Sequence, residues 1–439
     1  MVVEENQKEI LISWKEISAY LGCETRTCQR WEKESGLPVH RFIDSSRSRV
    51  FAYKQELNHW LKRRPYTDQK NPKKLLYFLI PMAALLIVCF MFLSPLSSPE
   101  PHDFRINGSD LVVLNEKQKE IWQYHTETMR LKDEEFYRKR FQVRRDSDNS
   151  CEVFHPLIVM RDIDNERQKE VLFAQRSIVP NRMKCILSCL NNKGKILWVF
   201  EAGREMIFGK KQYSSRYEIG GFMVVDLEMD NSPEIIVVSR NLYMFPTQLA
   251  VLDSKGHLLR EYWHSGRILD FTFYDLDHDE EKEIILSGCN NEYDKGFLAV
   301  LEPDFKSGGS PQTGYYKSPN LKQNVEKYYI LIPNTIVDKN EYKRGNVIKI
   351  HISDERIIYA ETKSGLCFEF GFNFELKEIR FADRYEDMYN KAYREGIAKE
   401  KFSVKTMDEL KTNLMTQVLY YTDEYWSQAP LLARNQVPD

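Results

Sequence analysis

The longest uninterrupted apolar run of the chain spans residues 75–93, LLYFLIPMAALLIVCFMFL, and has no charged side chain over 19 positions. A helix of this length, at 1.5 Å per residue, crosses most of the hydrocarbon core of a bilayer. The first basic residue after the run is Arg105. Six basic residues closely precede it, namely Lys62, Arg63, Arg64, Lys70, Lys73 and Lys74. By the positive-inside rule, this asymmetry predicts a single-pass membrane protein with a cytoplasmic N-terminus and a periplasmic or extracellular C-terminus.

Two other interpretations of the run are a cleaved signal peptide and a helix buried in a protein core. A signal peptide begins near the N-terminus, whereas 74 residues with the pattern of a folded domain precede this run. A retained membrane anchor is therefore the favoured interpretation.

Before the run, the polar and apolar positions predict two short helices. Ser13, with Glu16 three positions later, forms a capping box that starts the first helix. Gly22 ends this helix, and Thr25 begins a second helix that stops at Gly36. Two short helices joined by a tight turn are typical of a helix-turn-helix.

A hairpin and a third helix are expected next. Residues 39–42 and 49–52 are predicted strands around a polar turn, and residues 54–62 a helix. The segments WKEISAYLGCETRTCQRWEKESGLPVHRF and RVFAYKQELNHWL resemble MerR-like and excisionase winged helix-turn-helix domains. The resemblance implies an α+β domain whose partner is double-stranded DNA.

In such a domain the second helix enters the major groove, where Arg pairs with guanine and Gln with adenine, and the wing contacts phosphates. The predicted DNA contacts are Arg26, Thr27, Gln29 and Arg30 in the helix, and Arg41, Arg47 and Arg49 in the wing. Residues 1–74 contain 15 Lys and Arg against 10 Asp and Glu, a balance that favours an anionic partner. The alternative is a helical module that binds protein and whose charges are solvated.

After Pro99 the chain changes to short β-rich runs with a repeated acidic loop. Carboxylates recur at offsets 0, 2, 4 and 8, and each loop leads into an apolar strand. The three sets are Asp162, Asp164, Glu166 and Glu170; Asp226, Glu228, Asp230 and Glu234; and Asp275, Asp277, Asp279 and Glu283. Alternating oxygen ligands of a tight loop can converge on a hard cation such as Ca²⁺.

These loops resemble the DxDxDGxxE loops of FG-GAP and VCBS repeats, which occur in integrin-α-like β-propellers. The resemblance implies Ca²⁺ as the cofactor, and the Asp275 loop has the best ligand set. The usual glycine is absent, because its position is taken by Arg167, Asn231 and Glu280. The alternative is a solvated acidic turn that caps a strand.

Between the acidic loops lie β-hairpins, among them LVVLNEKQKEIWQY, LSCLNNKGKILWVF and LAVLDSKGHLLREY. Repeated antiparallel units of this size predict a β-propeller of four to seven blades. Gly194 and Trp198 resemble positions in quinone-cofactor propellers, but Trp198 is expected to pack between blades. Residues 125–150 are predicted to be a helical insertion or a long loop. The aromatic residues 420–426 are expected to close the last blade, or else to dock on a partner.

The predicted fold class is multidomain, with an all-β propeller-like domain as its largest part. Its segments are a winged helix-turn-helix (10–64), a basic linker (65–74), a transmembrane helix (75–93), a linker (94–108), the propeller-like domain (109–385) and a helical and aromatic C-terminal segment (386–439). Five cysteines follow the apolar run, and a Cys185–Cys189 disulfide is weighed against buried free thiols.

No GxSxG, HExxH or GxxxxGK[ST] motif occurs, so the chain is predicted not to be an enzyme. The combination predicts a membrane-anchored, one-component transcription regulator of a bacterium. An unknown outer ligand or protein would alter a homodimer and thereby its DNA binding. The alternative function is a calcium-stabilised surface adhesion or scaffold propeller with a protein-docking cytoplasmic domain, and a propeller enzyme is a third.

Overall fold

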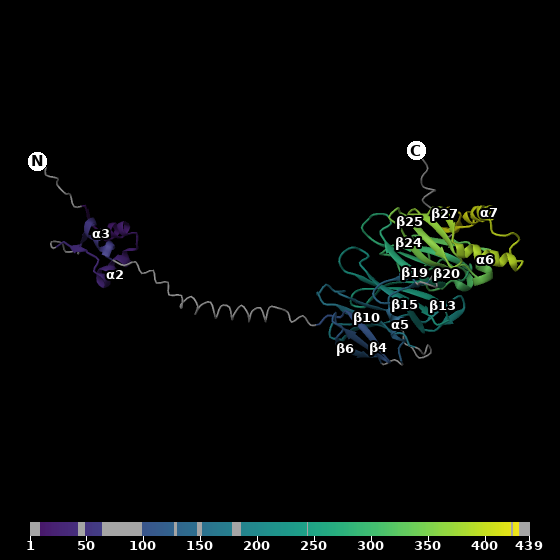
Figure 1. Cartoon of the computed structure of the whole chain (residues 1–439). Helices are drawn as coiled ribbons and strands as arrows, with labels where there is room; N and C mark the ends of the chain where they lie inside the picture. Colours follow the sequence, from purple (N-terminus) through teal and green to yellow (C-terminus); the bar gives the residue numbers. More distant parts are fainter. Residues whose placement is uncertain are drawn as a thin grey trace. The chain divides into compact units, whose positions relative to one another are not determined.

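The computed structural model describes residues 9–42, 49–63, 99–126, 130–146, 152–177, 186–243, 245–422 and 425–429. The chain divides into two compact units, Met1–Leu96 and Ser97–Asp439, and each is described by itself (Figure 1). The apolar run 75–93, the basic linker 65–74, Arg47 and Cys185 lie outside the described residues.

The described residues of the smaller unit form three helices and a short sheet with the strand order β1-β3-β2. Its elements are β1 (Ile10–Leu11), α1 (Trp14–Leu21), α2 (Thr25–Ser35), β2 (His40–Arg41), β3 (Val50–Tyr53) and α3 (Lys54–Arg63). The Ser13 side chain accepts a hydrogen bond from the Glu16 N–H at 3.2 Å, and Gly22 ends α1 with a φ of 64°. Ile17, Cys28 and Leu57 are fully buried at its centre.

None of the helices in the described ranges is both long enough and apolar enough to span a membrane. This finding does not support the predicted single-pass membrane topology or the transmembrane part of the predicted fold class, whose run 75–93 lies outside the described residues. The longest described helices, α6 (Asp383–Arg394) and α7 (Val404–Met415), have 12 residues each. A membrane span needs about 20 apolar residues.

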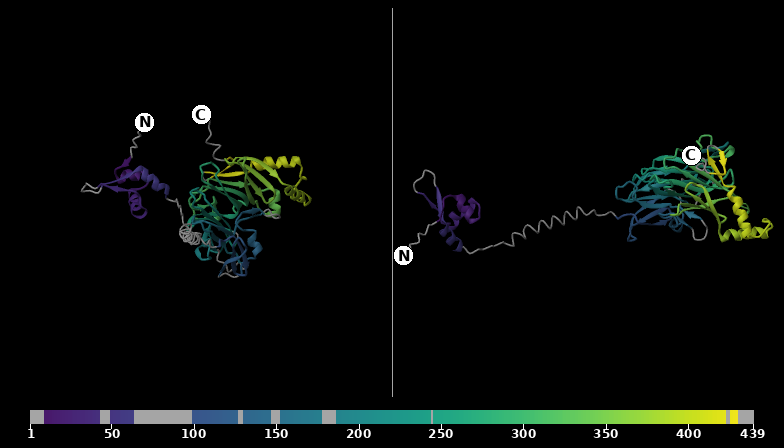
Figure 2. Two further views of the ribbon diagram at one scale, coloured as in Figure 1. Left: turned by 60° about the vertical axis from the view of Figure 1, so that its left-hand side comes forward. Right: turned by 90° about the horizontal axis from the view of Figure 1, so that it is seen from above.

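The larger unit is built from sheets of mostly antiparallel strands, and paired strands are mostly neighbours in sequence (Figures 1 and 2). The first sheet contains β4 (Asp103–Asn107), β5 (Asp110–Leu114) and β6 (Glu120–His125). The second contains β9 (Ile158–Arg161), β10 (Glu170–Ala174), β11 (Ile186–Leu190) and β12 (Ile196–Glu201). In the sequence, three short described elements come between these two sheets: α5 (Glu134–Arg138), β7 (Arg145–Asp146) and β8 (Val153–Phe154).

Three further sheets follow a two-stranded hairpin of β13 (Met206–Phe208) and β14 (Lys211–Tyr213). The third contains β15 (Tyr217–Val225), β16 (Glu234–Asn241), β17 (Thr247–Leu252), β18 (Leu258–His264) and β22 (Gly308–Gly309). The fourth contains β19 (Gly266–Tyr274), β20 (Glu283–Asn290), β21 (Lys295–Leu301), β23 (Tyr328–Ile332), β28 (Leu419–Thr422) and β29 (Tyr425–Ser427). The fifth contains β24 (Val347–Ile352), β25 (Ile357–Thr362), β26 (Leu366–Gly371) and β27 (Leu376–Phe381).

Successive meander sheets of about four strands are the repeating unit of a β-propeller. The second strands of three successive sheets, β10, β16 and β20, are buried along almost their whole length. Sheets that are covered on both faces need continuous apolar strands, which explains the runs EVLFA, EIIVV and EIIL. The propeller-like part of the predicted fold is therefore retained.

A repeated tryptophan contact joins neighbouring sheets. The Trp122 Nε1–H on β6 donates to the Asn192 carbonyl at 2.9 Å, and the Trp198 Nε1–H on β12 donates to the Ser254 carbonyl at 2.9 Å. Each indole also packs on the turn glycine of the next hairpin, where an added Cβ would lie 2.8 Å from Trp122 or 2.5 Å from Trp198. The prediction that Trp198 packs between blades is confirmed.

One expectation, for the aromatic residues 420–426, needs correction. The aromatic strands β28 and β29 extend the fourth sheet, because β28 pairs with β23, and so they do not close the last sheet. In the segment 125–150, the one described helix is α5, whose Tyr137 is fully buried against the second sheet. The predicted helical insertion thus agrees with α5, and this helix is part of the core.

Candidate functional site

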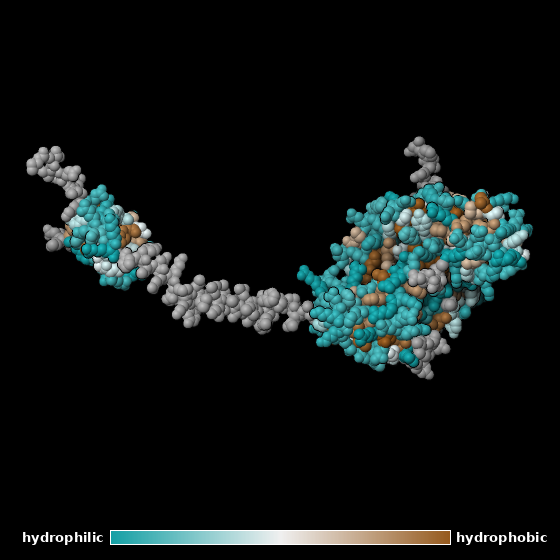
Figure 3. All heavy atoms as spheres, in the orientation of Figure 1, coloured by the Kyte–Doolittle hydropathy of each residue, from teal (hydrophilic) through white to brown (hydrophobic). Residues whose placement is uncertain are grey.

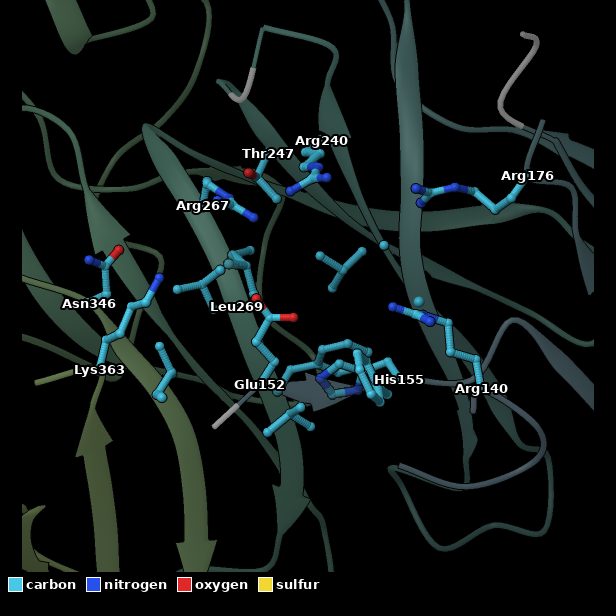
Figure 4. Close-up of a pocket in the computed structure, with 18 of the residues that line it drawn as sticks. Arg140, Glu152, His155, Arg176, Arg240, Thr247, Arg267, Leu269, Asn346 and Lys363 are labelled. Carbon is cyan, nitrogen blue, oxygen red and sulfur yellow. The ribbon is translucent and has the colours of Figure 1, made fainter. Parts of the chain in front are cut away.

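A cavity of about 320 Å³ lies between the sheets of the larger unit (Figure 4). Small-molecule sites in proteins usually have about 300–1,000 Å³. The wall contains five cationic side chains and one carboxylate, namely Arg140, Arg176, Arg240, Arg267, Lys363 and Glu152. The visible face of the larger unit is mostly hydrophilic, with scattered apolar side chains, in Figure 3. The cavity is therefore the most distinctive binding surface that the described residues offer.

The first strands of three successive sheets are each bulged where they line this cavity. The pairing register shifts between Ile219 and Gly221 in β15, between Ile268 and Asp270 in β19, and between Val347 and Lys349 in β24. The extra residues are Gly220, Leu269 and Ile348, and all three line the cavity. A β-bulge bends its strand and redirects side chains, and bulges are frequent beside functional sites.

Glu218 on β15 fixes two of the arginines. Its Oε2 lies 3.0 Å from Arg176 Nη2, and its Oε1 accepts a hydrogen bond from Arg240 Nε at 2.8 Å. Arg176 also donates to the Ile219 carbonyl at 2.6 Å. The two guanidinium charges outweigh the burial of Glu218 and lower the pKa of its carboxyl. Arg176 and Arg240 are therefore held in place and partly neutralised.

Arg140 is arranged differently from these two arginines. Its guanidinium carbon lies 4.2 Å from the Phe136 ring centre and 4.3 Å from the Phe154 ring centre, so the group is stacked between two aromatic faces. Its Nη1 donates to the Phe136 carbonyl at 3.2 Å. Burial and the nearby Arg176 lower the pKa of Arg140 to about 10. Its positive charge is thus poorly compensated by the described residues.

Arg267, on β19, is the second poorly compensated arginine. Among the described side chains, no hydrogen bond or ion pair to its guanidinium is present. Burial and the nearby Arg240 lower the pKa of Arg267. Figure 4 shows Arg240 and Arg267 close together on one side of the cavity and Arg140 with Arg176 on another.

Asp270 lies beside the cavity-lining residues Leu269 and Phe271 and connects β19 to Arg144 and to β24. It is fully buried and accepts hydrogen bonds from Arg144 Nε at 2.8 Å and from the Ile350 N–H at 2.7 Å. His155 Nε2 lies 3.0 Å from Asp270 Oδ1, at an angle outside hydrogen-bond geometry. Burial opposes the charge of Asp270, but His155 and Arg144 outweigh it and lower the pKa of its carboxyl. Burial lowers the pKa of His155 and outweighs the opposing effect of Asp270.

The three acidic loops fold as turns that are capped by their own carboxylates. The last carboxylate of each loop is buried and accepts from a backbone N–H within the loop: Glu170 from Ile163, Glu234 from Leu227 and Glu283 from Leu276, at 3.1, 3.0 and 2.9 Å. The residues at the expected glycine position have φ angles of 62° (Arg167), 67° (Asn231) and 71° (Glu280). The loops thus keep the left-handed turn without glycine.

The structure brings together only part of the predicted metal ligands. Within the described residues, two groups have carboxylate oxygens within 4.8 Å of one another, Asp162–Asp164–Glu170 and Asp275–Asp277–Glu283. The third carboxylates of the loops, Glu166, Asp230 and Asp279, are exposed and outside these groups. In the middle loop, Glu228 pairs with Arg260 at 3.1 Å.

The two close groups differ in their fit to a cation. In the Asp275 loop, Lys327 Nζ lies 2.8 Å from Asp277 and 2.6 Å from Glu283, so an ammonium already supplies positive charge there. In the Asp162 loop, Asp162 Oδ1 is buried without a hydrogen-bond partner among the described groups. Burial, with the nearby Asp164 and Asp162, raises the pKa of Glu170 to about 7. The Asp162 loop therefore fits a cation, whereas the Asp275 loop does not.

The predicted DNA-contacting residues lie in the smaller unit. Arg26, Gln29, Arg30 and Arg49 are exposed, and Thr27 is half-buried. Arg41 pairs with Glu32 of α2 at 2.7 Å, so its charge is already engaged. The turn between β2 and β3, which would form the tip of the wing, lies in residues 43–48, outside the described ranges.

The cavity arginines were missed in the sequence, although one signal was present. Arg176 and Arg240 each stand six positions after the last glutamate of an acidic loop, Glu170 and Glu234. Aligning the repeats would have placed both at the end of a buried strand, where a charged side chain is unusual. Arg140 and Arg267 have no such repeat signal.

Comparison with known proteins gives no family. No family model matches the chain, and no curated protein matches it. Solved structures include one of a protein of unknown function from Bacteroides caccae, at 9% identity and a TM-score of 0.29, covering 65% of this chain and 74% of that one. BamB from Moraxella catarrhalis is similar at 13% identity and a TM-score of 0.32, covering 64% of this chain and 62% of that one. The Dos1 propeller is similar at 8% identity and a TM-score of 0.32, covering 64% of this chain and 67% of that one.

These findings correct the predicted resemblances. Neither a MerR-like or excisionase winged helix-turn-helix model nor an FG-GAP or VCBS model matches, so both family assignments and the winged helix-turn-helix part of the fold class are wrong. Short segments that follow common rules of capping and turn formation can imitate a family motif, because those rules are not specific to a family.

Proposed function

We propose that the Ser97–Asp439 unit is a ligand-binding domain whose cavity holds a small anionic molecule. The observation that carries this proposal is the state of Arg140 and Arg267, two half-buried arginines whose guanidinium groups have no carboxylate hydrogen bond among the described residues. Taking a cation out of water is unfavourable unless an opposite charge accompanies it. A bound anion would supply that charge and accept several charge-assisted hydrogen bonds.

Binding is favoured over catalysis by the types of side chain present. Four of the five cations are arginines, which stay protonated at any physiological pH and bind carboxylate or phosphate in a fixed geometry. Thr247 and Asn346 add neutral hydrogen-bonding groups to the wall. Such a wall suits recognition, and the domain would act as a sensor of its ligand.

Isothermal titration of the full chain with inorganic phosphate, sulfate and citrate, at constant ionic strength, tests this function. We expect saturable binding of at least one anion, weakened about 10- to 100-fold by Arg267→Met, since a charge-assisted hydrogen bond contributes about 1.5–3 kcal/mol. Arg105→Met is the matched control, because Arg105 is exposed on β4 and does not line the cavity. Equal binding by both variants and the wild type would place the anion elsewhere and refute the proposal.

Of the three acidic loops, only the Asp162 loop remains a predicted Ca²⁺ site. Asp162, Asp164 and Glu170 would supply oxygen ligands, and the ion would stabilise the turn. Titration of Ca²⁺ into the full chain should show one site that Asp164→Asn weakens and Asp279→Asn leaves unchanged. The alternative function, a calcium-stabilised adhesion or scaffold propeller, also depends on this site and remains a prediction.

The double-stranded DNA partner also remains a prediction, as does the homodimer. The predicted DNA binding depends on the exposed Arg26, Gln29 and Arg30 of α2. A gel-shift titration of the full chain at low salt, where phosphate contacts are strongest, would detect such binding. A shift that Arg26→Ala/Arg30→Ala does not weaken would exclude these residues as the contact.

A further inference from the structure

We infer that the cavity recognises a small organic acid with two separated anionic groups, of the dicarboxylate class. This inference rests on the proposed function, since it concerns the ligand of the same cavity. It depends on how the arginines are grouped in the wall.

The four arginines form two pairs, and each pair has one held member and one available member. Arg176 stands beside Arg140, and Arg240 stands beside Arg267, in Figure 4. The held members, Arg176 and Arg240, both bind Glu218. The available members, Arg140 and Arg267, are left to bind a ligand. A ligand with one anionic group for each pair would give both Arg140 and Arg267 a counter-charge.

Glu218 joins the held members of the two pairs. Its Oε2 forms an ion pair with Arg176 at 3.0 Å, and its Oε1 accepts a hydrogen bond from Arg240 Nε at 2.8 Å. Because Glu218 is engaged by Arg176 and Arg240, Arg140 and Arg267, one in each pair, have no carboxylate hydrogen bond among the described residues. In Figure 4 the two pairs face the cavity from different sides.

Part of the cavity wall is apolar. Val238, Leu269 and Phe271 line the cavity, together with the glycines of the β15 bulge. Gly221 has no room for a side chain, because an added Cβ would lie 2.2 Å from the His155 Cβ. These apolar side chains suit the methylene groups of a short dicarboxylate.

The position of Glu152 in the ligand-free cavity also fits a ligand that contacts both Arg140 and Arg267. Its carboxylate acts electrostatically on both Arg140 and Arg267, and Figure 4 shows it directed into the cavity. A negative charge placed there interacts with both available arginines. A bound dianion would do the same with one charge for each arginine.

The test is isothermal titration of the full chain with succinate, glutarate and adipate, each compared with the monocarboxylate of the same chain length at equal ionic strength. We expect at least one dicarboxylate to bind about 10- to 100-fold more tightly than its monocarboxylate counterpart. Arg140→Met and Arg267→Met should each reduce this preference to about threefold or less. Arg105→Met is the control, and thermal melting of each variant checks that it folds.

The outcomes separate this inference from the proposed function. If monocarboxylates or phosphate bind as tightly as every dicarboxylate, the cavity binds anions but the two-group inference is overturned. If none of these anions binds the wild type, both fail. If Arg140→Met is unfolded, Arg140→Lys is used in its place. This variant keeps the charge but loses the planar guanidinium, so it should still lower the preference for dicarboxylates.

Discussion

Lys327 places its ammonium nitrogen 2.6 Å from Oε1 of Glu283, the buried last carboxylate of the third acidic loop. The same nitrogen lies 2.8 Å from Asp277 and 2.8 Å from Glu302. Burial opposes the charge of Lys327, but the three carboxylates outweigh it and raise its pKa. A side chain of the protein thus supplies the cation in the loop that had the best set of predicted metal ligands.

Removal of this ammonium should destabilise the fourth sheet and create a need for metal. We expect Lys327→Met to lower the free energy of unfolding by about 2–3 kcal/mol, because it leaves the Glu283 carboxylate buried and unpaired. Millimolar Ca²⁺ should restore part of the loss. Urea denaturation with and without Ca²⁺ measures both effects. Lys322→Met, at an exposed position, is the control, and a variant as stable as this control would contradict the assignment.

The Asp162 loop should make stability depend on pH. The pKa of Glu170 is raised to about 7 in the folded chain, against an ordinary value near 4.5. The folded state therefore binds more protons than the unfolded state between these values, so stability falls as pH rises from about 4.5 to 7. We expect Glu170→Gln to reduce this fall by about 1–3 kcal/mol in urea denaturation at pH 5, 6, 7 and 8. An unchanged slope would show that Glu170 ionises normally.

Removing the carboxylate from the cavity should strengthen anion binding. Glu152 acts on Arg140 and Arg267 and competes with a ligand for both. We expect Glu152→Gln to lower the dissociation constant for inorganic phosphate about 3- to 10-fold, an effect that 0.5 M salt should reduce. Glu120→Gln changes the same charge at an exposed site on β6 and should leave the constant unchanged. Weaker binding by Glu152→Gln would make Glu152 a ligand contact instead.

Asp270 should be essential to the stability of the larger unit. Its carboxylate joins Arg144, the β24 backbone at Ile350 and the β19 bulge. Asp270→Asn leaves the Arg144 guanidinium without its buried counter-charge, so we expect a loss of about 3–5 kcal/mol. Thermal melting compared with the exposed control Asp304→Asn measures this loss. Equal melting temperatures would contradict the role of Asp270.

Local patterns predicted the elements that depend on local chemistry. The Ser13 cap, the Gly22 helix end, the acidic turns and the tryptophan contact of Trp198 each depend on residues a few positions apart or on one repeated hairpin. The identification of families from the same patterns was wrong, because caps and turns recur in unrelated folds.

The cavity was out of reach of such patterns. Arg140 comes from a segment that the sequence marks only by its charge, and Arg267 is 127 positions further along the chain. Their proximity depends on the packing of separate sheets and on bulges at Gly220 and Leu269, which shift the register by one residue. The sequence showed the acidic loops clearly, but not that Lys327 reaches the third loop from 44 positions after Glu283.

The most direct test of the central claim is an anomalous difference map from crystals of the full chain soaked in sodium selenate, a dianion whose selenium scatters anomalously. The account predicts a selenium peak inside the cavity, within hydrogen-bond distance of Arg140 or Arg267, and no cavity peak in crystals of the Arg140→Met/Arg267→Met variant. Selenate bound only at the outer surface, with the cavity free of it, would contradict the claim that this cavity is an anion site.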